Sequence, residues 1–500
     1  MPRGGTSSTA GRARFRTRTW KRCWRPGSPP ADPNLRADAR GDEMHRPDSA
    51  RPSLIRPVRL AVDAERKWLG FHALRLAMGV LGQGRPVEAV LSEDLPEPAF
   101  TELLEATDPA APLDWDRVSI SHDPQRITLR ADSGLERTVV RNGRHGLQVL
   151  PSGAAEPLVR APEPEVPQRE IGRPWPLGDE PETGQLPAGA VSRIRALLDR
   201  LTSDGLGRAA VVAHRGKLVA ESYAPGFPRE MRHNGWSATK SVAGVLAGRL
   251  VHEGLLELDR PAPVPEWAHD ARSGITLRHL LAMSSGLDCP PGAAAWAHGD
   301  RHFGVYAGPD DVWRDMSGLG LLAPPGTRCA YQNSDPLLSA GIAVRVAAAA
   351  GLAEPVDVPW RLLFDPLGMD SVLLGSDAAG NFLLSGVCLA TALDWARFGQ
   401  FVLDDGVWQG RRLLPGGWLD YVLAPAEADD EGLYGGGLCW LGRPVYEGGV
   451  PDRTALASGM YGQRVFVLPE HELVVVRLGQ GDDEELLAAV VCEVARIVAG

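Results

Sequence analysis

The sequence predicts an α+β or three-layer fold whose sheet takes strands from both ends of the region 188–500. Strand-like segments open this region and return near its end, and long helical patterns fill the stretch between them. A final helical pattern closes the chain. Strands separated by a run of helices indicate one sheet built from both chain ends, because helices and strands must bury their apolar faces in a shared core.

Local patterns justify each element. The spacing of apolar residues predicts helices at 191–201, 238–253, 334–350, 391–403 and 483–498. Two apolar runs around the turn from His214 to Lys217 predict a hairpin over 208–224. Later strands are expected at 433–441, 463–469 and 472–478.

Three segments precede this region. Residues 1–55 are rich in Arg, Pro, Gly and Ser without apolar periodicity, which predicts a disordered tail. Residues 56–150 are expected to form a small N-terminal α/β appendage, because a helical pattern over 68–82 is followed by short alternating strands with Asp-Pro and Asn-Gly turns. Dense proline predicts an extended linker over 151–187.

Composition excludes several classes of function. The formal net charge of -10 argues against nucleic acid as a main partner, because binding phosphates requires a basic surface. No apolar run reaches the ~20 residues that span a bilayer. Six cysteines without a CxxC pair indicate neither a zinc site nor a disulfide scaffold. His298 and His302 are four residues apart but have no third ligand in view, so we expect no metal and no cofactor.

Lysine is rare in this chain: only four of the 53 lysine and arginine residues are lysines. One of the four, Lys240, stands out by its position. Lys240 follows Ser237 by three residues at the start of an amphipathic run, so the two share a face of the first helical turn. A serine nucleophile needs a base within hydrogen-bond reach, and a buried lysine can lose its proton where arginine cannot. The structural alternative makes Ser237 a helix N-cap and Lys240 a solvated residue.

Two further stretches carry candidate site residues. Tyr331 and Asn333 form a Tyr-x-Asn pattern; a tyrosine near a lysine can transfer protons, and an asparagine can both donate and accept hydrogen bonds. The alternative is a packed tyrosine and a helix cap. At 457–479, a glycine-rich edge leads into two apolar strands, where glycine lets a ligand approach the backbone closely. An ordinary hairpin is the alternative interpretation there.

Taken in order, these motifs resemble the serine β-lactamase-like, penicillin-recognising family, in particular its class C-like branch of esterases and 6-aminohexanoate-dimer hydrolases. The resemblance covers about 190–500 and includes "WSATKSVAGVLAGRL", "ITLRHLLAMSSGLD", "PPGTRCAYQNSD" and "GQRVFVLPEHELVVVRLG". It implies an antiparallel sheet flanked by helices beside a mostly helical subdomain, with the active site at their junction. The site residues fall at matching motifs.

By this resemblance, Ser237 is the acylated nucleophile, and Lys240 and Tyr331 form the proton-transfer pair. Asn333 orients the acyl portion of a small-molecule substrate. The backbone N–H groups of Ser237 and Met460 form the oxyanion hole. A serine hydrolase that acts through an acyl-enzyme is therefore expected. From its position before the catalytic region alone, we expect the appendage at 56–150 to pack beside the site entrance and limit substrate size.

One departure from the family concerns the substrate. The family's third motif is often Lys-Thr-Gly, or has His in place of Lys, whereas Ala457, Ser458 and Gly459 stand here. Ala457 cannot hold the carboxylate of a penicillin, so the departure favours an ester or linear amide. A β-lactamase or DD-peptidase and an inactive binding protein on the same scaffold remain alternatives. The absence of a convincing signal peptide slightly favours the cytoplasm, although the family includes exported members.

Overall fold

The computed structural model describes residues 64–95, 115–163, 172–182, 186–289, 304–308, 310–481 and 483–500. All of these belong to one unit, Ser53–Gly500. The predicted tail at 1–55 and the pair His298 and His302 lie outside the described residues. Within the described ranges, no helix combines the length and the apolar character that crossing a bilayer requires.

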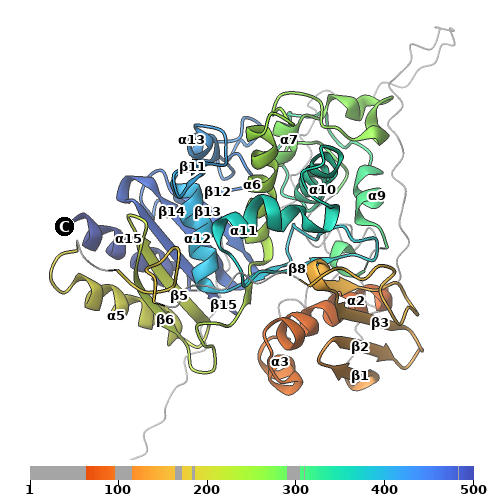
Figure 1. The fold of residues 1–500 in the computed structure, drawn as a ribbon, viewed down its shortest axis with the longest axis horizontal. Helices are drawn as coiled ribbons and strands as arrows, with labels where there is room; N and C mark the ends of the chain where they lie inside the picture. The colour runs from red at the N-terminus through yellow and green to blue at the C-terminus, as the bar shows by residue number, and fades with distance from the viewer. Residues whose placement is uncertain are drawn as a thin grey trace, which may run out of the picture. The chain divides into compact units, whose positions relative to one another are not determined.

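The main sheet has six antiparallel strands in the order β12-β13-β14-β15-β5-β6 (Figure 1). Their bounds are β5 Gly207–His214, β6 Lys217–Tyr223, β12 Trp440–Leu441, β13 Ala455–Gly459, β14 Gln463–Leu468 and β15 Leu473–Gly479. Strand β15 pairs with β5, for example Val476 with Val211, so strands from both ends of the region meet at the centre of the sheet. This topology confirms the prediction from the sequence.

Helices cover both faces of this sheet. Every residue of β5 and of β15 is buried, as expected for strands that are covered on both faces. Helix α5 (Ala190–Thr202) packs on β5 and β6 and touches the last helix, α15 (Glu484–Ala499). Helix α12 (Ala392–Leu403) packs on β5, β14 and β15. The apolar stripe of each helix therefore supplies the second layer that the strands need.

A helical subdomain lies beside the main sheet (Figure 1). Helix α10 (Ser334–Ala349) is its centre and packs against α6 (Thr239–His252), α7 (Leu277–Leu281) and α9 (Val312–Ser317). Helix α6 also contacts β13 of the main sheet. Helix α6 therefore lies at the junction between the helical subdomain and the main sheet.

The N-terminal segment forms a second sheet with strands that come much later in the chain. The order is β1-β2-β3-β4-β8-β9-β7. The bounds are β1 Val118–Asp123, β2 Arg126–Ala131, β3 Glu136–Arg141, β4 Leu147–Val149, β7 His233–Asn234, β8 Leu373–Ser376 and β9 Cys388–Ala390. Strand β4 pairs in parallel with β8, and β9 pairs with β7, which leads directly into the segment around Ser237. The N-terminal strands are thus continuous with the sheet that supports that segment.

Two helices complete the N-terminal segment. Helix α2 (Ala64–Ala77) continues into a π-helical turn over Met78–Gly82, and α3 (Val87–Glu93) follows. Helix α2 packs on β2 and β3. The helix predicted over 68–82 is confirmed, whereas the domain boundaries at 150 and 188 remain a prediction.

Part of the proline-rich stretch is packed against the main domain. The Trp175 side chain is 2% exposed. The buried guanidinium of Arg397 on α12 donates to the carbonyl oxygens of Pro176 and Gly178, at 2.9 and 2.7 Å, and forms an ion pair with Asp179. These contacts fix 175–179 onto α12.

The strand predicted over 433–441 is wrong for most of its length, because only Trp440–Leu441 is a strand. Gly437 and Leu438 have φ values of 62° and 60°, in the left-handed region, which turns the chain out of an extended path. The Leu438 backbone then binds the helical subdomain, donating to the Leu281 carbonyl and accepting from the Ser241 hydroxyl. The apolar pattern of this stretch reflects burial in a turn.

Candidate active site

The Ser237 hydroxyl lies at the start of α6, in a 3-10 turn over Trp236–Ala238 that follows β7. Ala238 is the N-cap of α6, so Ser237 does not have the capping role considered as an alternative. Trp236, directly before it, has a φ of 46°. A non-glycine residue in this region costs about 1–3 kcal/mol and persists only where its surroundings hold it.

The Lys240 amine is buried beside this hydroxyl. Its Nζ lies 3.0 Å from Ser237 Oγ and donates to the Ser385 carbonyl oxygen at 2.8 Å. The side chain is 1% exposed, which contradicts the solvated alternative. Burial lowers the pKa of Lys240 well below its usual value, and the nearby Cys289 opposes this only in part. A lysine in this environment can hold an uncharged amine that accepts a proton.

The Tyr331 ring also lies near the amine. Lys240 Nζ is 4.9 Å from the centroid of the Tyr331 ring. The ring packs against Trp440 and Tyr434, with centroid separations of 5.1 and 6.2 Å. The fold thus brings together Ser237, Lys240 and Tyr331, three residues that the sequence separates by up to 94 positions (331 minus 237).

The end of β13 lies directly against the segment around Ser237. A Cβ atom at Gly459 would lie 2.0 Å from the Gly235 carbonyl oxygen and 3.0 Å from the Ser237 nitrogen. Only glycine permits this approach of strand to turn. The stretch Ala457 to Gly459 therefore occupies the strand beside Ser237, and Met460 follows at its end.

Asn333 and Ser458 are both buried, and each is a near neighbour in sequence of a residue described above. Asn333 is at the N-cap position of α10, two residues after Tyr331. Ser458 precedes Gly459 on β13. Their roles in binding a substrate stay predictions.

Several residues around the site were not identified from the sequence. The Ser385 carbonyl binds Lys240 from 145 positions away, and the Tyr306 hydroxyl lies 2.8 Å from Ser385 Oγ. Trp236 packs against Tyr461, and Trp440 packs against Tyr331. No local signal marks these residues, because their proximity depends on the tertiary fold. Among the described residues, no cluster of three or more His, Cys, Asp or Glu side chains is arranged to hold a metal ion.

A buried carboxylate supports the Tyr331 segment. Oδ1 of Asp335 accepts hydrogen bonds from the Ser285 hydroxyl, the Gln332 amide and the Ser334 hydroxyl at 2.7, 2.7 and 3.1 Å. The side chain is fully buried, and this burial raises its pKa to about 7 despite these hydrogen bonds. The network connects the segment that carries Tyr331 to Ser285, which follows α7.

The Asp335→Asn variant should change how stability depends on pH. The pKa of Asp335 is higher in the folded than in the unfolded chain, so the folded state binds more protons between about pH 4 and pH 7 and stability falls as pH rises through that range. Between pH 5 and pH 8 the free energy of unfolding of the unmodified protein should fall by about 2–3 kcal/mol. The Asp335→Asn variant should not show this fall, because its side chain does not titrate. Urea unfolding at several pH values measures this loss. The control is Asp132→Asn, because Asp132 is exposed. If the free energy of unfolding changed equally with pH in all three proteins, the raised pKa of Asp335 would be refuted.

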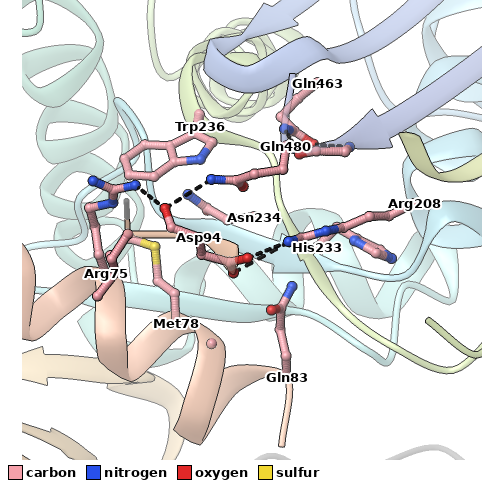
Figure 2. Close-up of a pocket in the computed structure, with 13 residues that line it drawn as sticks. Arg75, Met78, Gln83, Asp94, Arg208, His233, Asn234, Trp236, Gln463 and Gln480 are labelled. Carbon is pink, nitrogen blue, oxygen red and sulfur yellow. Dashed lines mark hydrogen bonds and ion pairs between the residues drawn. The ribbon is translucent and has the colours of Figure 1, made fainter. Parts of the chain in front are cut away.

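A polar pocket is lined by Trp236 but not by Ser237 (Figure 2). Figure 2 shows Arg75, Arg208 and Gln480 around Asp94, with dashed lines from each to the aspartate. His233 lines the pocket too, and burial together with the nearby Arg208 and Arg85 lowers its pKa to about 3. The pocket lies where the N-terminal segment meets the main domain.

Comparison with known proteins gives consistent matches. The model of the family described as Beta-lactamase matches residues 193–491. A 6-aminohexanoate-dimer hydrolase from Paenarthrobacter ureafaciens is 28% identical over 324 residues, which cover 60% of this chain and 80% of that protein. The family model spans the segments that carry Ser237, Lys240, Tyr331 and Met460.

Solved structures share the fold. One assigned to a 6-aminohexanoate-dimer hydrolase from Bacillus anthracis has a TM-score of 0.52 and 21% identity, and covers 60% of this chain and 82% of that chain. A family VIII carboxylesterase has a TM-score of 0.51 and 17% identity, with coverage of 63% and 100%. At these identities the structural matches establish the fold alone, and they confirm the predicted α+β class.

Proposed function

Because the chain belongs to the beta-lactamase family, we propose that it is a serine hydrolase that cleaves an ester or a linear amide through an acyl-enzyme on Ser237. One observation carries the proposal. The buried Lys240 amine, whose pKa is lowered by desolvation, lies 3.0 Å from the Ser237 hydroxyl. This arrangement supplies the base that a serine nucleophile needs.

The proposed reaction has two steps. Lys240 takes the proton of the Ser237 hydroxyl while Oγ attacks the substrate carbonyl carbon, and the negative charge on the carbonyl oxygen is held by the N–H groups of Ser237 and Met460. The Lys240–Tyr331 pair passes the proton to the leaving alcohol or amine as its bond to the carbonyl carbon breaks. Water then attacks the acyl-enzyme, which releases the acid and restores the Ser237 hydroxyl.

Two features support an ester or linear amide as the substrate. Ala457 is apolar and buried, so this position offers no cation for a penicillin carboxylate. The sequence relative and the solved structures carry the names 6-aminohexanoate-dimer hydrolase and carboxylesterase. Asn333 and Ser458 are the proposed contacts for the acyl portion.

The Ser237→Ala variant should lose both turnover and covalent labelling. We would incubate the protein with p-nitrophenyl esters, a linear amide and nitrocefin, and record intact mass spectra at early times. The unmodified protein should gain one acyl group, and the variant should lose at least about 10³-fold in kcat/KM because its nucleophile is missing. Ser203→Ala, at an exposed serine, is the matched control and should behave like the unmodified protein.

The same experiment separates the alternatives. Faster turnover of nitrocefin than of esters or amides would favour a β-lactamase or DD-peptidase. An absence of adduct with every substrate and with a phosphonate probe would favour an inactive binding protein. Equal turnover in Ser237→Ala would exclude Ser237 as the nucleophile.

A further inference from the structure

Two residues in the left-handed region flank the proposed oxyanion hole. Trp236, with φ 46°, precedes Ser237, and Tyr461, with φ 61°, follows Met460. Neither is a glycine, so neither conformation persists without support from neighbouring groups. The two rings contact each other edge to face, with centroids 5.5 Å apart. The peptides that carry the two proposed oxyanion donors are therefore joined through this aromatic pair.

Helix α2 of the N-terminal segment packs on both rings. The Phe71 ring lies 6.3 Å from the Trp236 ring. The Arg75 guanidinium lies 5.7 Å from the Phe71 ring and 5.5 Å from the Tyr461 ring. We call these four side chains, Phe71, Arg75, Trp236 and Tyr461, the α2 clamp. Phe71, Arg75 and Trp236 are buried, so the clamp is packed on several sides.

The arginine of the clamp is anchored independently of its ring contacts. Arg75 Nη2 donates to the Asp94 carbonyl oxygen at 2.5 Å, and Gln480, just after β15, donates to the same oxygen at 3.0 Å. The Asp94 carboxylate forms an ion pair with Arg208 on β5 (Figure 2) and a second one with Arg85. These bonds tie the N-terminal segment to the central strands of the main sheet beside the pocket.

A second set of hydrogen bonds fixes the backbone of the Met460–Gly462 turn. The Gln463 side-chain amide donates to the carbonyl oxygens of Met460 and Tyr461 at 3.1 and 3.0 Å. Arg477 on β15 donates to the Tyr461 carbonyl at 3.3 Å. The carbonyls are thus held by the main sheet, while the Tyr461 ring is held by α2.

We propose that Phe71 and Arg75 are positioning residues for the hydrolysis: α2 holds Trp236 and Tyr461 in their left-handed conformations and thereby aligns the N–H groups of Ser237 and Met460. This inference rests on the proposed function. It assigns to the N-terminal segment an effect on the rate of acylation that is independent of acyl-chain length. A segment that only limited substrate size would instead change the preference between short and long acyl chains.

The test compares Phe71→Leu and Arg75→Met with Arg130→Met, an exposed arginine of the same segment, as the matched control. A p-nitrophenyl phosphonate first titrates functional sites and gives the rate of Ser237 labelling per functional site. Turnover of acetyl, butyryl and octanoyl esters is then measured on the same samples. Losing an oxyanion donor costs 10²–10³ in kcat, so partial misalignment should lower kcat and labelling rate by about 10- to 100-fold. We expect KM to change by less than about 3-fold, equally for all three esters.

The outcomes are distinct. A fall in the titrated fraction with an unchanged rate per functional site would mean that α2 only stabilises the fold, and would overturn the inference. A change confined to the preference between esters would overturn it in favour of a substrate-size role. Arg75→Lys retains a cation beside Tyr461 and should recover part of the lost rate, and no recovery would count against the ring contact. If the unmodified protein is not labelled at Ser237, the proposed function itself fails, and this inference with it.

Discussion

The Lys240→Met variant will lose turnover by about 10²–10⁴-fold and, at the same time, become more resistant to unfolding. General-base catalysis contributes about 10²–10⁴-fold, and methionine cannot accept the Ser237 proton. The gain in stability comes from removing a buried amine. Below the ordinary pKa of lysine the unfolded chain protonates this amine, whereas the folded protein resists protonation because Lys240 is buried.

The sign of this stability change follows from proton linkage. The unfolded state binds more protons than the folded state between the lowered pKa of Lys240 and the usual value of 10.5, so stability rises with pH across that window. Each unit by which the pKa is lowered costs about 1.4 kcal/mol at a pH below both values. Methionine fills a similar volume without this cost. Thermal unfolding at neutral pH should therefore give a higher midpoint for Lys240→Met.

The half-buried Lys217 offers the matched control, because it has the same side chain in an ion pair with Glu182 near the surface. Lys217→Met should leave both activity and stability nearly unchanged, since surface ion pairs contribute about 0–1 kcal/mol. The unmodified protein should also lose activity as pH falls through the lowered pKa of Lys240, because protonation removes the base. A Lys240→Met protein with half or more of normal turnover would exclude the amine as the base.

The Gly459→Ala variant should lose about 10²–10³-fold in kcat/KM. Its new Cβ atom would lie 2.0 Å from the Gly235 carbonyl oxygen, closer than any non-bonded contact allows, so either β13 or the segment around Ser237 must move. Either movement separates the N–H groups of Ser237 and Met460, and loss of one oxyanion donor costs a factor of this size. Ester hydrolysis per titrated site measures the effect.

Gly274→Ala is the control for this substitution, because a Cβ atom there meets no atom within 4 Å and its φ is not positive. That variant should retain normal turnover. Normal turnover in Gly459→Ala would instead show that β13 does not occupy the place described here, and would withdraw Met460 as an oxyanion donor.

The sequence predicted the main fold well because its elements are defined by local periodicity. The helices at 239–252 and 392–403 and the strands at 463–468 and 473–479 carry apolar patterns of the right period, and the structure confirms them. The segment at 433–441 failed because burial alone produced its apolar pattern. Two left-handed residues, Gly437 and Leu438, decide its path, and a pattern of hydrophobicity does not encode them.

The site was predictable only where a short motif marks it. Ser237 and Lys240 are three residues apart, and Tyr331 lies in its own motif, so each could be selected before their proximity was known. The Ser385 carbonyl and the contacts of Phe71 and Arg75 come from pairings across 145 to nearly 390 positions, for example Arg75 with Tyr461. Such contacts depend on how layers stack, and single-sequence periodicity carries no information about stacking.

The parallel pairing of β4 with β8 has a consequence for biosynthesis. Leu147 pairs with Gly375, so 228 residues (375 minus 147) must leave the ribosome before β4 meets its partner. At about 5–20 residues per second, β4 remains an open sheet edge for roughly 10–45 s, and such an edge can pair with other chains. The nascent N-terminal segment is therefore exposed to mispairing during synthesis, and slow translation should lower the yield of soluble product more than slow refolding of the finished chain.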